Sequence, residues 1–186
     1  RHTEPFFEHY APTPIQHDGA TVHVFMGSLL GQVSTATTYT PLVGAQIDIP
    51  AQSTVRIPLD AEFEYGVLLD SGELSGNGHP IPVDNLAYFA PGSRELTLSA
   101  GETPVRMLLI GGEPLRESIV MWWNFIGRSH DEIVEYRARW QAEVIETSSN
   151  AGADASSLGR FGHVEGYPGA ALPAPVMPNV RLRPRD

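Results

Sequence analysis

From about residue 20 to residue 112, the chain is a series of short runs in which apolar and polar residues alternate. Alternation with a period of two gives each run one apolar side, which is typical of a half-buried β-strand. The runs that predict strands are 20–26, 45–49, 55–59, 63–69, 86–89, 95–98 and 105–110. Because no helical pattern separates them, they predict a mainly β fold, an antiparallel sandwich or barrel.

Turn-forming residues stand between these runs, at 50–53, 70–72, 75–78, 90–92 and 100–102. Gly, Pro, Asn, Asp and Ser favour turns because they tolerate or impose the backbone angles that turns need. In particular, Gly76-Asn77-Gly78 supplies the positive φ angles of a tight hairpin.

The pattern changes after the last of these runs. The stretch at 119–126, which is apolar except for Asn124, predicts a buried strand that leads into a helix. Ser129 followed by Glu132 predicts a capping box, in which Ser129 caps the amide of Glu132 and Glu132 reaches back to Ser129. Apolar residues then recur at helical spacing, at Ile133, Tyr136, Trp140 and Val144. We therefore expect an amphipathic helix over 130–146, with its Trp140 face packed on the outside of the barrel.

The composition divides the chain into four segments. We expect an amino-terminal arm over 1–19, the β-barrel over 20–128, the carboxy-terminal helix over 129–147, and a loop with an extended tail over 148–186. Residues 147–159 consist mainly of Ser, Asn, Gly and Ala, which predicts a mobile loop. The tail is rich in Pro and Gly and carries single apolar anchors, so it gains stability only by docking.

Charge and composition exclude several classes of function. The net charge is −10, and all 12 basic residues are Arg. Clustered positive charge is needed to bind nucleic acid, and the one cluster here, Arg181, Arg183 and Arg185, fits a solvated tail. There is no Cys, so disulfides and zinc–thiolate sites are excluded. With no signal-peptide pattern and no apolar run near the ~20 residues of a membrane span, we expect a soluble cytoplasmic protein without a membrane partner.

Side chains of the types that hold metals or act as catalysts are scattered along the chain. The seven histidines are His2, His9, His17, His23, His79, His130 and His163. No two are separated by one residue, so no strand directs two imidazoles into a barrel. His2 and His9 can chelate only weakly in an arm. Glu62 and Glu64 alternate on one predicted strand face, where two carboxyl groups can pair as acid and base, but a solvated strand face explains them better.

No hydrolase elbow, phosphate loop or dinucleotide fingerprint is present either. The residues therefore predict no catalytic, cofactor-binding or metal site within this chain.

One block is specific enough to resemble a known family. Gly111-Gly112-Glu113-Pro114-Leu115, followed by Met121-Trp122-Trp123-Asn124-Phe125, resembles the end of the second domain of bacterial pirin-family proteins. The resemblance continues through 40–45, 66–68, 71–73, 86–92, 161–164 and 172–175. It implies the carboxy-terminal half of a bicupin, a jelly roll of the cupin type. In that family the amino-terminal cupin holds one iron on three His and one Glu, and the carboxy-terminal cupin lacks the metal. Members are associated with quercetin 2,3-dioxygenase activity and with regulation through protein partners.

The general cupin motifs give an internal check on this resemblance. If Gly72 ends the first motif, its Glu position is Tyr65 and its two His positions lie between Pro58 and Ala61. If Gly76 and Pro82 belong to the second motif, its second Gly position is Asp84, its His position is Ala87 and its Asn position is Pro91. Because the metal-binding positions hold poor or impossible ligands, the resemblance implies a cupin without metal. Iron is expected only in an amino-terminal cupin outside this sequence.

Three functions remain open. The first is a structural and interaction domain that supports an amino-terminal iron cupin, with that domain, a second copy or another protein as partner. The second is an enzyme in its own right with an unrecognised site. The third is a binding module for a small apolar ligand in the barrel mouth. The sequence leaves the substrate, the partner, the oligomeric state and the choice between a fragment and a short natural member undetermined.

Overall fold

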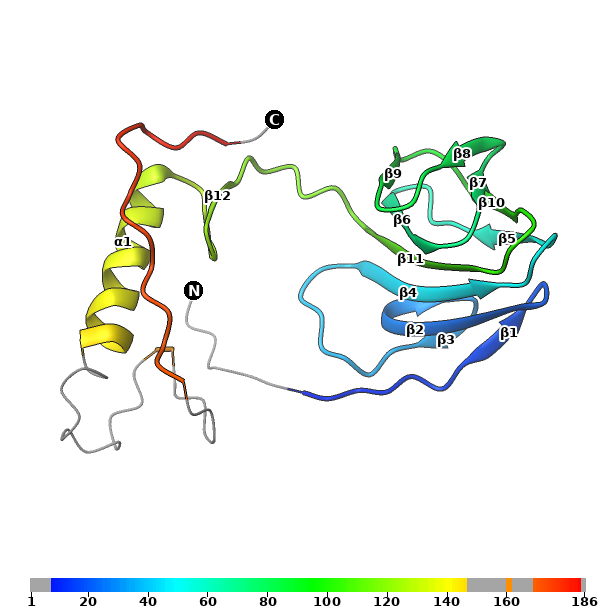
Figure 1. Ribbon diagram of the computed structural model, residues 1–186, viewed down its shortest axis with the longest axis horizontal. Helices are drawn as coiled ribbons and strands as arrows, with labels where there is room; N and C mark the ends of the chain where they lie inside the picture. The colour runs from blue at the N-terminus through cyan, green and yellow to red at the C-terminus, as the bar shows by residue number, and fades with distance from the viewer. Residues whose placement is uncertain (1–7, 147–159, 162–168, 185–186) are drawn as a thin grey trace. The chain divides into compact units, whose positions relative to one another are not determined.

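The computed structural model describes residues 8–146, 160–161 and 169–184. They belong to two compact units, which are described separately (Figure 1). We call Glu8–Leu115 the β unit, and the described residues from Arg116 onward the hairpin–helix unit.

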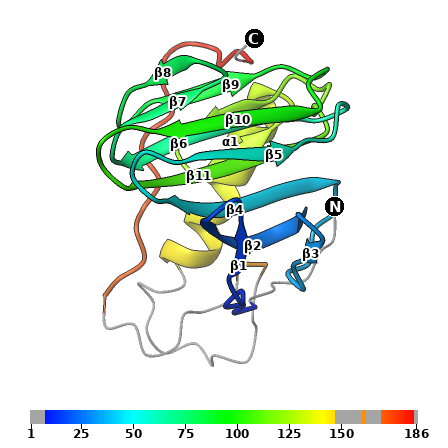
Figure 2. The ribbon, with the colours of Figure 1, turned by 90° about the vertical axis from the view of Figure 1, so that its right-hand side faces the viewer.

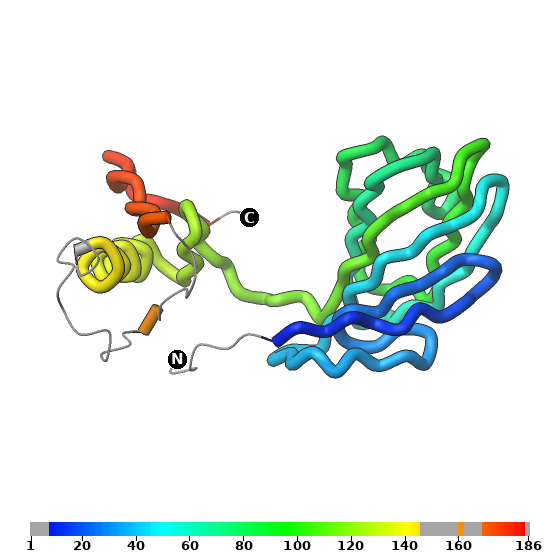
Figure 3. The backbone as a smooth tube through the Cα atoms, turned by 60° about the horizontal axis from the view of Figure 1, so that its bottom comes forward, coloured from blue at the N-terminus to red at the C-terminus, as the bar shows by residue number. Residues whose placement is uncertain are grey.

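The β unit consists of two antiparallel sheets (Figure 2). The larger sheet has the order β1-β2-β4-β11-β6-β9, with β3 paired to β2, and the smaller has the order β5-β10-β7-β8. The larger sheet contains β1 (Ile15–His17), β2 (Ala20–Leu29), β3 (Gln32–Val33), β4 (Leu42–Ile49), β6 (Glu64–Ser71), β9 (Leu86–Phe89) and β11 (Val105–Gly112). The smaller contains β5 (Thr54–Pro58), β7 (Leu74–Gly76), β8 (His79–Ile81) and β10 (Glu95–Ala100). No helix interrupts the described chain from β1 to β11 (Figure 3).

The core lies between the two sheets. Burial alternates most clearly in β5, where Val55 and Ile57 are fully buried while their neighbours face solvent. Ile47 of β4 and Leu109 of β11 are likewise fully buried. Burying a side chain of this size stabilises the fold by about 1.5–3 kcal/mol, so the apolar alternation determines which face of each sheet turns inward.

All seven predicted strands are present, and β9 has the predicted bounds. Four further strands were missed because they are only two or three residues long: β1, β3, β7 and β8. The predicted hairpin at Gly76-Asn77-Gly78 is confirmed, since Asn77 (φ 49°) and Gly78 (φ 81°) connect β7 to β8. Residues 15–17, which we assigned to an arm, pair with β2.

The prediction of a single strand over 119–126 was wrong. The segment is a hairpin of β12 (Val120–Trp122) and β13 (Phe125–Gly127), in which Trp122 pairs with Phe125. Trp123 reverses the chain with φ at 50°. An aromatic residue rarely adopts this left-handed conformation, so its type did not signal a turn. Aromatic packing compensates for this disfavoured conformation, because the Trp123 ring centroid lies 5.3 Å from that of Phe125 and 6.2 Å from that of Trp140.

The predicted helix is present as α1 (His130–Trp140), continued by a π-helical segment, η1 (Gln141–Glu146). Ser129 caps α1 as predicted, since its hydroxyl accepts from the Glu132 amide at 3.2 Å. The Glu132 carboxylate accepts from the amide of Arg128 at 2.7 Å. Ile133 is fully buried against Val120 and Phe125 of the hairpin.

Trp140 contacts residues of its own unit, Trp123 and Phe161. The packing of this helix face on the barrel stays a prediction. Residues 169–184 of the predicted tail lie along α1, whereas the loop predicted over 147–159 is outside the described residues (Figure 1). Within the described part of the chain, no helix is both long and apolar enough to cross a membrane.

Candidate functional site

The cupin motif spacing predicts the Glu ligand position at Tyr65, which lies in β6. Its side chain is buried, with 4% exposed, and its ring centroid lies 6.1 Å from that of Phe63. The phenol oxygen accepts a hydrogen bond from the Asp60 amide at 2.8 Å and donates to the Asp60 carbonyl oxygen at 3.4 Å. Burial raises the pKa of Tyr65, so the phenol stays protonated at neutral pH. Tyr65 therefore closes the turn that precedes its own strand.

The first-motif His positions, between Pro58 and Ala61, lie in that same turn. Leu59 packs against the core, and the Asp60 carboxylate accepts from the Glu62 amide at 2.9 Å. Such a side chain-to-backbone bond two residues along is what Asp supplies in turns. None of these residues offers an imidazole to the barrel interior.

The second-motif positions are also without ligands. Ala87, at the His position, and Phe89 both pack against the core. Phe89 reaches the opposite sheet, since a Cβ on Gly76 would lie 3.1 Å from the tip of its ring. Asp84, at the second Gly position, has φ at 62°, which explains why Gly is common there and why a short Asp is tolerated. Ala87 and Phe89 therefore contribute apolar side chains, and no metal ligand, to the core of the β unit.

The described histidines lie in different surroundings. His17 bonds to the Arg56 carbonyl oxygen at 2.8 Å, His9 and His79 are exposed, and His23 lies on the outer face of β2. The Nδ1 atom of His130 accepts from the Leu182 amide at 3.1 Å. His2 and His163 lie outside the described residues. Among the residues that the structure describes, no three or more His, Asp or Glu side chains gather as a metal site. The expectation of no metal and no catalytic residue stays a prediction.

Glu62 and Glu64 do not share a strand face. Glu62 lies in the turn before β6, whereas Glu64 is the first residue of β6 and accepts from the Tyr88 hydroxyl at 2.9 Å. This hydrogen bond raises the pKa of Tyr88. The pair is therefore not arranged as an acid and a base.

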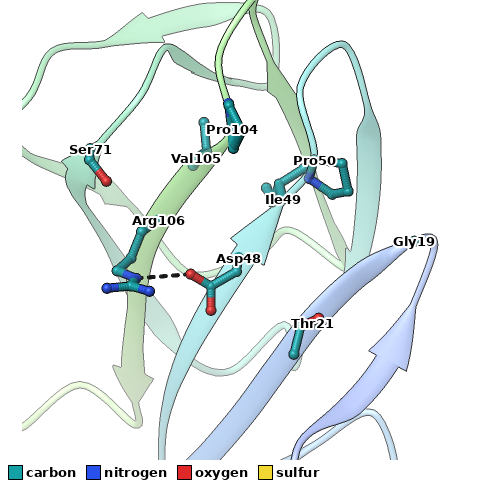
Figure 4. A pocket seen from close by; sticks show the side chains of 9 residues that line it. All are labelled: Gly19, Thr21, Asp48, Ile49, Pro50, Ser71, Pro104, Val105 and Arg106. Carbon is teal, nitrogen blue, oxygen red and sulfur yellow. Dashed lines mark hydrogen bonds and ion pairs between the residues drawn. The ribbon is translucent and has the colours of Figure 1, made fainter.

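A polar cavity of about 500 Å³ lies on the β unit, beside the end of β4 (Figure 4). Its charged groups are Asp48 and Arg106, which form an ion pair with 2.9 Å between carboxylate oxygen and Nε. Burial raises the pKa of Asp48, but hydrogen bonds from Arg106 and Gln46 outweigh it and hold this pKa below its ordinary value. The Asp48 carboxylate is thus held in its charged form by the Arg106 and Gln46 side chains, as in a structural ion pair.

A second depression, of about 470 Å³, lies on the outer face of the larger sheet. We call it the sheet-face groove. Its wall includes four apolar side chains that are strongly exposed: Leu86 (56%), Tyr88 (64%), Ile110 (42%) and Leu115 (57%). Its floor includes Gly66, where a Cβ would lie 2.9 Å from Leu86 and 3.3 Å from Ile110, so glycine allows these side chains to close over the strand. Sequence reasoning missed this surface, because the alternation that buries one face does not reveal which residues meet on the other.

Two facing antiparallel sheets with a filled apolar interior define a cupin-type β-sandwich, which confirms the predicted fold class. Residues 44–146 match the family described as the pirin C-terminal cupin domain. The chain therefore belongs to the pirin family and corresponds to its carboxy-terminal cupin.

Comparison with individual proteins agrees. The chain is 35% identical to the "Putative quercetin 2,3-dioxygenase" of Pseudomonas aeruginosa, over 96% of this chain and 52% of that protein. It is 27% identical to a pirin-like protein of Caulobacter vibrioides, over 75% of this chain and 48% of that protein. A crystal structure of quercetin 2,3-dioxygenase from Acinetobacter baumannii superposes with a TM-score of 0.79 at 35% identity, over 97% of this chain and 55% of that one. The chain thus spans about half the length of the relatives it matches.

Proposed function

We propose that this chain is the metal-free half of a pirin-type bicupin and acts as a structural and interaction domain for an amino-terminal iron cupin. The observation that carries the proposal is the filled barrel: Tyr65 and Ala87 stand where the cupin motif spacing places ligands, and Phe89 packs beside them against the core. A barrel packed in this way has no open coordination position for oxygen chemistry. Quercetin 2,3-dioxygenase activity would then belong to the complete protein, through its other half.

The sheet-face groove supports the interaction part of this proposal. Exposed apolar surface of this kind usually marks an association site. The half of the relatives that this chain does not match is long enough for one more cupin. We therefore assign the groove to the amino-terminal cupin as its docking surface.

A fusion protein tests the proposal. The amino-terminal half of the Acinetobacter baumannii relative would be placed ahead of this chain, and iron content and oxygen consumption with quercetin would be measured for the fusion and for the chain alone. We expect iron and turnover in the fusion only. Turnover by the chain alone, abolished by a chelator, would overturn the assignment of chemistry to the other half.

A variant of the groove tests the docking surface separately. Ile110→Lys places a charge among the exposed apolar side chains, so we expect the fusion to lose stability and activity while the chain alone keeps its fold. Val33→Lys is the matched control, because Val33 of β3 is 66% exposed and does not line the groove. Equal effects of the two substitutions on the fusion would contradict the docking surface without affecting the metal-free assignment.

A further inference from the structure

The tail, residues 169–184, is recognised through its backbone by side chains of α1 and the residue after it. The Trp140 Nε1–H donates to the Leu172 carbonyl oxygen at 2.9 Å. The Gln141 side-chain oxygen accepts from the Ala174 amide at 2.7 Å. These bonds satisfy polar groups that an extended chain cannot satisfy internally, so the helix surface holds the tail through its main chain.

Arg137 extends this recognition along the tail. Its guanidinium donates to the Pro175 carbonyl oxygen and, at 3.4 Å, to that of Ala174. Pro173 and Pro175 have no amide hydrogen to leave unsatisfied, and their fixed φ favours an extended chain. An aromatic ring with a hydrogen-bond donor beside an extended Pro-containing segment is the arrangement by which proteins bind proline-rich peptides.

Ala174 is the tail residue whose side chain has to be small. It is 6% exposed and lies in the small core formed by Val120, Phe125 and Ile133. The residue two positions later, Val176, is 85% exposed. The site therefore accepts a small residue at the first position and any residue at the second.

The other end of the tail is fixed at the start of α1. The Arg181 guanidinium forms two hydrogen bonds with the Asp131 carboxylate, at 2.8 and 3.2 Å, and the Leu182 amide donates to His130. The tail thus runs antiparallel to the helix, from Trp140 back to His130 (Figure 1). Opposite charges at this end determine the direction in which an occupant can bind.

We propose that this face of α1, formed by His130, Asp131, Arg137 and Trp140 together with Gln141, is a peptide-binding site that accepts the tail of a second copy of this chain in place of its own. All the contacts named above lie between the tail and the hairpin–helix unit, so a second copy's tail makes the same contacts. Exchange of an identical segment between protomers costs little. The chain is held again at Phe161, whose amide donates to Glu143 at 2.8 Å, so exchange involves only the residues beyond that anchor.

The test uses full-length chains and a fluorescein-labelled peptide of residues 169–184. In the Ala174→Arg variant, the chain's own tail cannot occupy the binding face, and the face itself is unchanged. We therefore expect this variant to bind the peptide at least tenfold more tightly than the wild type. Val176→Arg is the matched control, because it adds the same charge at an exposed position, and it should behave like the wild type. Equal peptide affinity for both variants would overturn the proposal.

Exchange between copies is tested by mixing two variants. Ala174→Arg keeps the face and loses the tail, whereas Arg137→Ala/Gln141→Ala keeps the tail and weakens the face. We expect differently labelled chains of these two kinds to associate one to one, at least tenfold more strongly than Val176→Arg associates with Arg137→Ala/Gln141→Ala.

Circular dichroism of each chain verifies folding. If Ala174→Arg is not folded, Pro173→Gly/Pro175→Gly replaces it, since it loosens the tail without burying a charge. Folded partners that fail to associate would refute exchange.

Discussion

Replacing Tyr65 by Phe tests whether this position is structural. The substitution removes only the hydroxyl, which leaves the Asp60 amide without the 2.8 Å bond that it donates and keeps the buried ring in place. Leaving a buried or half-buried donor unsatisfied costs about 1–3 kcal/mol. We therefore expect the free energy of unfolding of the β unit to fall by about 1–2 kcal/mol, which lowers the urea midpoint by roughly 0.5–1 M at a slope of about 2 kcal/mol/M.

The assay must distinguish the two units. All three tryptophans, Trp122, Trp123 and Trp140, lie in the hairpin–helix unit, so their fluorescence follows that unit. Far-ultraviolet circular dichroism follows the strands, most of which are in the β unit. The Tyr65→Phe substitution should move the circular dichroism transition and leave the tryptophan transition unchanged.

Tyr88→Phe is the matched control. Tyr88 also donates a hydrogen bond, to Glu64, but it is 64% exposed, so water replaces the lost partner. We expect a change within about 0.5 kcal/mol for this variant. If Tyr65→Phe and Tyr88→Phe shift the midpoint equally, the hydroxyl of Tyr65 does not stabilise the turn and the reasoning fails.

Three further predictions follow from local geometry. Gly72→Ala should destabilise the β unit by on the order of 2–3 kcal/mol in urea unfolding, because φ is +96° and a Cβ would lie 2.3 Å from the Pro104 carbonyl oxygen. Gly78→Ala, at φ +81° with open space around it, should cost about 1 kcal/mol, and equal costs would contradict the steric argument. Ser129→Ala should lower the stability of the hairpin–helix unit by about 1 kcal/mol in tryptophan fluorescence, whereas Ser129→Asp should preserve it.

Tail docking should weaken in acid, because the hydrogen bond from Arg181 lowers the pKa of Asp131 in the folded chain. The stabilisation of the docked tail by this pair is present above the unfolded pKa of about 3.9. It is lost as the pH falls through the lower pKa of the folded chain. Asp131→Asn should remove this part of the pH dependence of tryptophan fluorescence. An unchanged pH profile in this variant would refute the role of the Arg181–Asp131 pair in tail docking.

The sequence predicted the strands well where burial alone decides the structure. For β5, period-two alternation predicted the run at 55–59, which is one residue off at each end. For β9, the turn residues that follow the run at 86–89 gave its bounds correctly. The strands that were missed, such as β3, are too short to show a period. The hairpin at 120–127 depends on Trp123 in a conformation that its residue type disfavours, and only the packed rings around it reveal why.

The candidate site was likewise predicted from the sequence only in part. The cupin motif spacing identified Tyr65 and Ala87 as occupants of ligand positions, because motif positions are a property of the sequence alone. The sheet-face groove could not be predicted, since Leu86 and Ile110 come together only through strand pairing across Gly66. The same holds for the tail site, where Gln141 and Ala174 are distant in sequence. They meet through a hydrogen bond from the Ala174 amide to the Gln141 side chain, which no sequence pattern signals.

The most direct test of the metal-free assignment is elemental analysis of the purified, tag-free chain after anaerobic incubation with Fe(II) and removal of unbound metal. Measurement of iron, nickel, manganese and copper per chain decides the question, because a cupin centre holds one metal. We predict well below 0.1 equivalent of each, as expected when Tyr65, Ala87 and Phe89 fill the barrel interior. Close to one equivalent of any of them, retained through gel filtration, would contradict the metal-free assignment.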